Sequence, residues 1–156
     1  MRWSGLRAAV VERFAPEFQK RLDIHSAAYG ACTCGHAWLT FDGNIIANFC
    51  TRAHSIANGW EPASTRENPM YRNQYTDFGE LSRQDAYQAC WAFVHDLSIE
   101  QALNDDDPLI QSLAVADSRI GKRRLVQLDA SLLHRLPAHI LELRRTILGI
   151  ERRNAA

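Results

Sequence analysis

Ala37-Trp38-Leu39-Thr40-Phe41-Asp42-Gly43-Asn44-Ile45-Ile46-Ala47-Asn48-Phe49 is the stretch that decides the fold. Two runs of residues that favour strands flank an Asp-Gly pair, the pattern typical of a β-hairpin. A two-residue turn would pair Leu39 with Ile46 and leave both faces of the hairpin mixed. A three-residue loop at 41–43 would pair Leu39 with Ile45. We expect the second register, because it gathers apolar side chains on one face, namely Ala37, Leu39, Ile45, Ala47 and Phe49.

The residues before the hairpin predict one helix, one helical turn and one extended segment. We expect Ser4 to be the N-cap of an amphipathic helix over residues 5–15. The apolar face of this helix is made of Leu6, Val10, Val11 and Phe14. Pro16 interrupts this pattern and begins a short helical turn at 16–22, since proline is tolerated in a first turn. Residues 24–29 are expected to be extended.

The second half of the chain predicts helices, which we place at 83–97, 98–103, 108–120 and from Pro137 onward. Ser82 and Asp85 resemble a capping box at the start of the first of these helices. Asp107 precedes a proline, the arrangement of an N-cap followed by proline at the first helical position. Gly121 would end that third helix as its C′ residue.

These elements predict an α+β fold with an N-terminal helix, a small antiparallel sheet containing a β-hairpin, and a C-terminal helical half. We expect one domain over 1–156. Its 46% hydrophobic residues can supply a core, and its formal net charge of zero excludes a polyanion binder carried by overall charge.

We find neither a signal-like apolar run near the start nor a membrane-length apolar window. We therefore predict a cytoplasmic protein whose cysteines are mostly reduced.

Two regions are candidates for a protein interface. Residues 58–79 form a long loop whose aromatic residues include Trp60, Tyr71 and Tyr75. These rings either contact a partner or pin the loop to the core, because aromatic side chains bury large areas. The last helix carries a broad apolar arc that either packs inside one subunit or also contacts a second copy, through Ile140, Ile147 and Ile150.

Charge is unevenly distributed along the chain. The formal charge is +2 over 1–60, −8 over 61–118 and +6 over 119–156. One interpretation is an anion-binding surface formed by Arg119, Lys122, Arg123 and Arg124. The alternative is structural, because cations after a helix C-terminus offset the helix dipole and could pair with the acidic run at 105–107.

A cluster of cysteine and histidine residues suggests a metal site. Cys34, His36, Cys50 and His54 are four candidate zinc ligands, and the expected register places Cys34 opposite Cys50. The cluster lacks the paired C-x2-C knuckles of common zinc modules. Reduced cysteines and surface histidines are therefore the alternative, and no other cofactor is predicted.

Short patches along the whole chain resemble a family of small bacterial proteins of unknown activity. They include Trp3-Ser4-Gly5-Leu6-Arg7, the hairpin start at 37–43 and the run Ala116-Asp117-Ser118-Arg119-Ile120-Gly121-Lys122-Arg123-Arg124-Leu125. The resemblance implies a single α+β domain and supplies neither an activity nor site residues.

No catalytic motif is found. The first hypothesis is a noncatalytic protein-interaction domain that binds a protein partner or its own copy. The second is an anion- or nucleic-acid-associated protein that uses the C-terminal basic segment, and the third is a zinc-binding domain or metal-dependent enzyme that uses the Cys/His cluster. A membrane partner is not expected.

Overall fold

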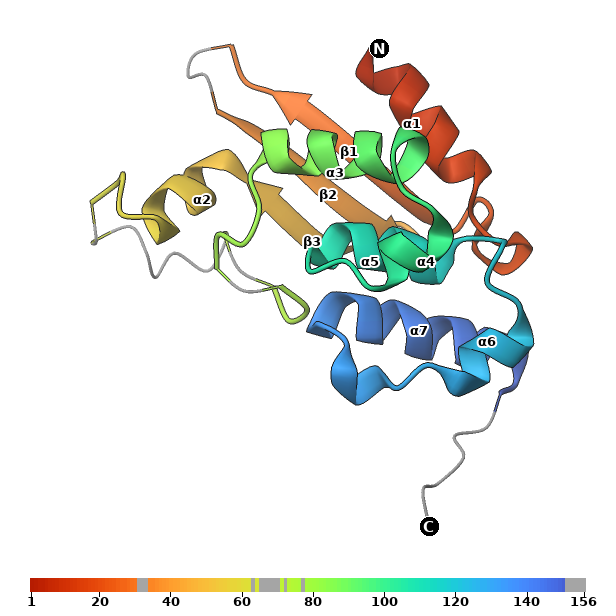
Figure 1. Cartoon of the computed structure of the whole chain (residues 1–156). Helices are drawn as coiled ribbons and strands as arrows, with labels where there is room; N and C mark the ends of the chain where they lie inside the picture. The colour runs from red at the N-terminus through yellow and green to blue at the C-terminus, as the bar shows by residue number, and fades with distance from the viewer. Residues whose placement is uncertain (31–33, 63, 65–70, 72, 77, 151–156) are drawn as a thin grey trace.

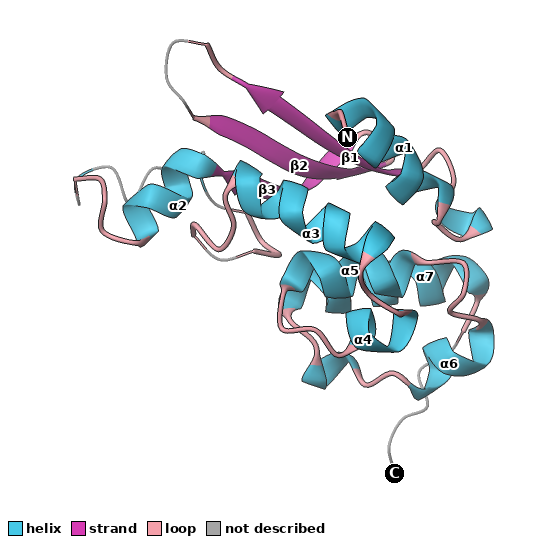
Figure 2. Cartoon of the chain, turned by 45° about the horizontal axis from the view of Figure 1, so that its top comes forward, coloured by secondary structure: helices cyan, strands magenta, loops and turns pink. Residues whose placement is uncertain are grey.

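The computed structural model describes residues 1–30, 34–62, 64, 71, 73–76 and 78–150. Three strands form an antiparallel sheet in the order β1 (Leu22–Ala28), β2 (Gly35–Phe41) and β3 (Asn44–Cys50). The helices lie on one side of this sheet (Figure 1, Figure 2). The fold is therefore α+β, with the predicted N-terminal helix, β-hairpin and C-terminal helical half.

The helical elements follow in chain order. They are α1 (Trp3–Glu12), η1 (Pro16–Phe18), α2 (Thr51–Ala57), α3 (Arg83–His95), α4 (Ile99–Leu103), α5 (Pro108–Ala116), α6 (Lys122–Gln127), η4 (Ala130–Leu132) and α7 (Arg135–Leu148). In the described part of the chain, no helix combines the length and the apolar character needed to cross a membrane.

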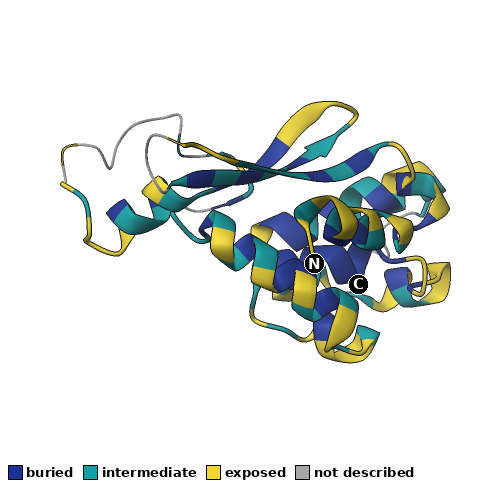
Figure 3. Ribbon diagram, turned by 90° about the horizontal axis from the view of Figure 1, so that it is seen from above, coloured by how far each residue is buried: buried dark blue, intermediate teal, exposed yellow. Residues whose placement is uncertain are grey.

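The helices stack in layers on the sheet. The first layer, α1 and α3, contacts the strands, α5 packs against α3, and α7 packs against α5. Alternation along the strands matches this arrangement, because Ile24, Leu39 and Phe49 are fully buried while their neighbours in sequence are half-buried. Viewed from above, the sheet forms one side of the molecule and the helices gather on the other (Figure 3).

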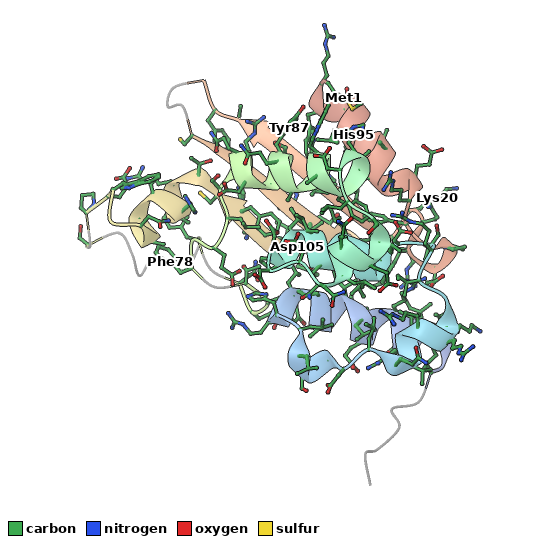
Figure 4. The ribbon with its side chains drawn as sticks, in the orientation of Figure 1. Met1, Lys20, Phe78, Tyr87, His95 and Asp105 are labelled. Carbon is green, nitrogen blue, oxygen red and sulfur yellow. The ribbon has the colours of Figure 1, made fainter. Side chains whose placement is uncertain are left out.

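The first layer is tied together near the chain start. The Tyr87 hydroxyl on α3 donates a hydrogen bond to the carbonyl oxygen of Met1 at 2.7 Å (Figure 4). The Tyr87 ring also lies 6.3 Å from that of Trp3 on α1, measured between centroids. This contact fixes α1 against α3 where both cover the sheet.

The expected hairpin register, with Leu39 opposite Ile45, is wrong along the whole hairpin. Asp42 and Gly43 both have positive φ (49° and 81°), as a two-residue turn requires, and Thr40 pairs with Ile45. A β-bulge follows, because Leu39 pairs with Ala47 and leaves Ile46 as the extra residue. The extra residue returns the side chains beyond it to the faces of the sheet that the expected register gave them. Only the two isoleucines change roles, so Ile45 is 56% exposed and Ile46 is buried.

Several helix boundaries also differ from expectation. The first helix begins at Trp3 after Arg2, which provides no side-chain cap, so Ser4 is not the N-cap. The turn after Pro16 is shorter than predicted, since β1 already begins at Leu22. The last helix begins at Arg135, two residues before Pro137, with the His134 side chain as its cap. The short helix α2 was not predicted at all.

The helix expected to reach Ile120 ends at Ala116, because Asp117 leaves the helical conformation and pairs with Phe14. Asp117 is fully buried, and its carboxylate accepts hydrogen bonds from the backbone and guanidinium of Arg119. Gly121 is therefore not a C′ residue but the N-cap of α6. Lys122 and Arg123 after it lie in the first turn of α6 and so do not offset a C-terminal dipole, whereas Arg124 lies in the last turn of this short helix.

Candidate functional site

A cleft of about 410 Å³ lies between α2, the segment before α3, α3 itself and the start of α5. We call it the acidic groove, and its described lining is His54, Glu80, Leu81, Asp85, Gln88, Ala89, Ala92, Asp107 and Ile110. This set holds three carboxylates and neither lysine nor arginine. The groove therefore combines negative charge with an apolar floor supplied by its alanine, leucine and isoleucine side chains.

Two of the carboxylates are positioned by helix starts. The Asp85 carboxylate accepts the Ser82 backbone N–H at 2.8 Å, while the Ser82 hydroxyl accepts the Asp85 backbone N–H at 3.0 Å. This is the capping box that the sequence predicted. The carboxylate of Asp107 accepts the backbone N–H groups of Leu109 and Ile110 at 2.8 and 3.1 Å. Both interactions hold a carboxylate in the lining of the groove.

The third carboxylate is held by the C-terminal half of the chain. Glu80 Oε1 lies 2.5 Å from His134 Nε2, the ring that also caps α7. The acidic groove is therefore assembled from three segments that are distant in sequence.

The charges in the groove act on one another. Burial raises the pKa of Asp107, and the negative charges of Asp105 and Asp85 raise it further, although two backbone N–H groups act in the opposite direction. A raised carboxyl pKa shows that the surroundings disfavour its negative charge. A cation beside the Asp107 carboxylate would favour its charged form.

An exposed tryptophan stands beside the groove. The His54 ring nitrogen Nδ1 donates to the carbonyl oxygen of Gly79 at 3.1 Å and lies 3.8 Å from the Asp85 carboxylate. Gly79 has a φ of +70°, and a Cβ there would lie 2.4 Å from the carbonyl oxygen of Ala53, so only glycine fits this approach. The other side of His54 contacts Trp60 edge to face at 5.8 Å. Trp60 is 72% exposed.

Comparison with known proteins gives a family. Residues 2–145 match the model of the SF0329 protein family. The chain belongs to the SF0329 protein family. Searches of curated proteins and of solved structures found no match. Membership of the SF0329 family confirms the expected resemblance to a family without a known activity, and it brings no site residues with it.

In this SF0329 family member the candidate interface residues are scattered. Ile140 is 1% exposed and belongs to the subunit's own core, so it cannot contact a second copy. Ile147 is 36% exposed, while Ile150 packs partly against the core. Of the loop aromatics outside the groove, Tyr75 stacks on His139 with 3.6 Å between centroids, and Tyr71 lines a different pocket. Residues 63, 65–70, 72 and 77 of this segment lie outside the described residues.

The four basic residues proposed to bind anions divide into two pairs. Arg119 forms an ion pair with Asp117 at 2.8 Å, and Arg124 forms one with Glu100 at 2.7 Å. Lys122 and Arg123 are exposed in the first turn of α6. The ion pairs of the described residues do not include the suggested pairing with the acidic run at 105–107, in which Asp107 caps α5 and Asp106 is exposed; Arg124 contacts Glu100 instead.

The four proposed zinc ligands do not form one cluster, because Cys34, His36 and Cys50 line one pocket and His54 lines the acidic groove. His36 pairs with Cys50 across the hairpin, not Cys34, and its ring nitrogen Nε2 lies 2.8 Å from Asn48 Oδ1. Cys34 is disulfide-bonded, contrary to the expected reduced state, and a disulfide sulfur is not a thiolate ligand. His54 belongs to the acidic groove. Across the residues that the structure describes, we find no group of three or more His, Cys, Asp or Glu side chains arranged to hold a metal ion.

Sequence reasoning found the two capping carboxylates but not the groove that they share. Asp85 and Asp107 were identified as caps of separate helices, and nothing local shows that α3 and α5 lie side by side. The one available signal was the charge of −8 over 61–118. That excess of negative charge marks the segment that supplies all three carboxylates.

Proposed function

We propose that this chain is a noncatalytic protein-interaction domain that binds a basic segment of a partner protein in the acidic groove. The observation that carries this proposal is the lining of the groove, in which three carboxylates gather without a lysine or arginine among the described lining residues. The chain as a whole is neutral, so this gathering of charge is local.

Arginine and lysine side chains suit both the charge and the floor of the groove. A guanidinium donates charge-assisted hydrogen bonds to carboxylates, which are stronger than neutral ones. The methylene stems of these side chains cover apolar surface while the charged ends reach polar groups. Leu81, Ala92 and Ile110 supply such a surface beside the carboxylates. A segment that alternates basic and apolar residues is therefore the expected ligand.

Trp60 supplies the anchor expected at an interface. Tryptophan is enriched among the residues that dominate binding energy at protein interfaces, and its ring face attracts cations. At 72% exposure, Trp60 still has most of its surface available, while its edge contact with His54 joins it to the groove.

The test is an NMR titration of the ¹⁵N-labelled chain with the peptide acetyl-Leu-Arg-Leu-Arg-Leu-amide. We expect shifts at the backbone amides of Asp85, Gln88, Ala92 and Asp107 and at the Trp60 indole. The same peptide with citrulline in place of arginine keeps the shape and removes the charge. It is expected to cause no comparable shifts.

Variants that remove one negative charge test whether the peptide binds in the acidic groove. Asp85→Asn and Asp107→Asn keep a capping oxygen and should each weaken peptide binding about ten-fold, the effect of losing one charged hydrogen bond. Asp106→Asn is the matched control, because Asp106 is exposed in the same acidic run and does not line the groove. Shifts that spread over the whole surface, or equal binding of both peptides, would refute the proposed function.

A further inference from the structure

The helix α6 carries a basic surface on its outer side. Lys122 and Arg123 are exposed, and Val126, one helical turn further on, is 41% exposed. Residues three or four positions apart are neighbours on the surface of a helix, so Val126 lies beside both cations. We call these three side chains the α6 face.

The two cations of the α6 face are available to a ligand. The third basic residue of this helix, Arg124, is held by its ion pair with Glu100 at 2.7 Å. Lys122 and Arg123 take part in none of the ion pairs between described residues, although the charge of Lys122 helps to lower the pKa of Glu17. The α6 face therefore presents two positive charges and an apolar side chain to solvent.

The α6 face has the chemistry of the ligand expected in the acidic groove. The groove offers three carboxylates and an apolar floor, with neither lysine nor arginine in its described lining. The α6 face offers two cations beside an apolar side chain. The formal charges of −8 over 61–118 and +6 over 119–156 show the same division along the sequence. A chain of zero net charge thus carries two surfaces of opposite charge.

These two surfaces lie apart within one copy of the chain. The groove is lined by His54 of α2, and α2 and α6 lie at opposite ends of the helical side (Figure 1, Figure 2). The position of α6 is also fixed, because Leu125 is fully buried and Arg124 binds Glu100. An acidic groove can therefore receive an α6 face only from another copy.

We propose that the basic segment bound in the acidic groove is the α6 face of a second copy of this chain. This inference rests on the proposed function and names its partner. Lys122 and Arg123 of the second copy donate charge-assisted hydrogen bonds to the groove carboxylates, and Val126 covers part of the apolar floor. The contact joins two different surfaces, so it is heterologous.

Sedimentation velocity measures this association directly. At low salt we expect the mean mass of the wild-type chain to rise with protein concentration. In about 1 M salt the mass should return to that of the monomer, because charges more than about 3 Å apart are then screened.

Two double variants each neutralise one surface. Asp85→Asn with Asp107→Asn neutralises the groove and keeps both capping oxygens, while Lys122→Gln with Arg123→Gln neutralises the α6 face. Each should weaken association about ten-fold or more, the effect of losing charged hydrogen bonds. Arg2→Glu is the control, because this exposed residue before α1 belongs to neither surface and the substitution changes the net charge as much as the α6 variant does.

A mixture of the two double variants tests whether the two surfaces bind each other. The groove variant keeps its α6 face, and the α6 variant keeps its groove, so one productive contact can form between unlike chains. Each variant alone should stay monomeric, and an equimolar mixture should form a complex that stops at two chains. Circular dichroism checks the fold, and Asp85→Asn or Arg123→Gln alone replaces a double variant that does not fold.

Several outcomes would overturn the inference. One is a wild-type chain that stays monomeric at low salt, and the proposed function still stands in that case if the arginine peptide binds the groove. Another is association that survives in either folded variant or that fails to return in the mixture. Association that only Ile147→Asp removes would also overturn it, because the contact would then lie on α7.

Discussion

Replacement of Arg144 by methionine tests which interaction holds α7 to the rest of the chain. Arg144 is 3% exposed. Its Nε donates to Glu17 at 2.6 Å, and its Nη1 donates to the carbonyl oxygens of Val115 and Asp117 at 2.7 and 3.0 Å. One guanidinium thus joins α7, η1 and the end of α5. Methionine keeps much of the volume and the apolar stem, and it removes all of these donors.

The expected loss of stability is large. Removal of one partner from a buried ion pair costs about 3–5 kcal/mol, because the other charge is left buried without compensation. Glu17, whose side chain is 11% exposed, would be that charge. With a urea dependence of about 2 kcal/mol per molar, the unfolding midpoint should fall by about 2 M. Arg123→Met is the matched control on an exposed side chain and should change the free energy of unfolding by less than about 0.5 kcal/mol.

The pH dependence of stability gives a second measure of the ion pair between Arg144 and Glu17. Burial by itself would raise the pKa of Glu17, but hydrogen bonds from Arg144 and a backbone N–H, with the charges of Arg144 and Lys122, outweigh it and lower this pKa. The stability from Glu17 is therefore present above its unfolded pKa, about 4.3, and is lost as pH falls through the folded value. In Arg144→Met burial dominates, so protonation of Glu17 relieves the variant while it weakens wild type.

The two urea midpoints should therefore approach each other as the pH is lowered from neutral to about 4. Circular dichroism at a series of pH values measures both midpoints. A variant as stable as wild type at neutral pH would refute the assignment of Arg144 as the central tie. So would a deficit that stays constant on acidification.

Two further predictions concern zinc and self-association. Cys34 is disulfide-bonded and His54 donates to Gly79, so we expect elemental analysis of the purified chain to give far less than one zinc per chain. A chelator should then leave the melting temperature unchanged. Near-stoichiometric zinc would contradict this prediction. Ile147 is the one exposed isoleucine of the arc on α7 that we expected to contact a second copy, so any dimer formed through α7 should dissociate to folded monomer in Ile147→Asp. Light scattering that shows a wild-type monomer at high concentration would rule that dimer out.

The hairpin shows what patterning can predict and where it fails. Side-chain alternation correctly assigned Ala37, Leu39, Ala47 and Phe49 to the core, because an error of two residues in register leaves every face unchanged. The turn and the bulge are separate local choices that both satisfy this alternation. Alternation could not distinguish a three-residue loop from a two-residue turn followed by a bulge at Ile46.

Helix ends were predictable where the cap is local. The caps at Ser82 and Asp107 use side chains within three residues of the groups they satisfy, and both were placed correctly. The end of α5 depends on pairing between Asp117 and Phe14, more than a hundred residues away in sequence. Local residue preferences favour continuing that helix, because nothing in the neighbouring sequence shows the tertiary partner that ends it.

The acidic groove depends both on local helix caps and on contacts between residues that are distant in sequence. Asp85 and Asp107 are required where they stand as helix caps, so their presence in the sequence needs no ligand to explain it. Their convergence in space has another origin, because the packing of α3 against α5 brings the two carboxylates near each other. Burial is the main cause of the raised pKa of Asp107, and the charges of Asp105 and Asp85 add to it. Asparagine would cap α5 as well and avoid that repulsion. The negative charge is therefore more than capping requires, and a cationic partner in the groove gives it a use.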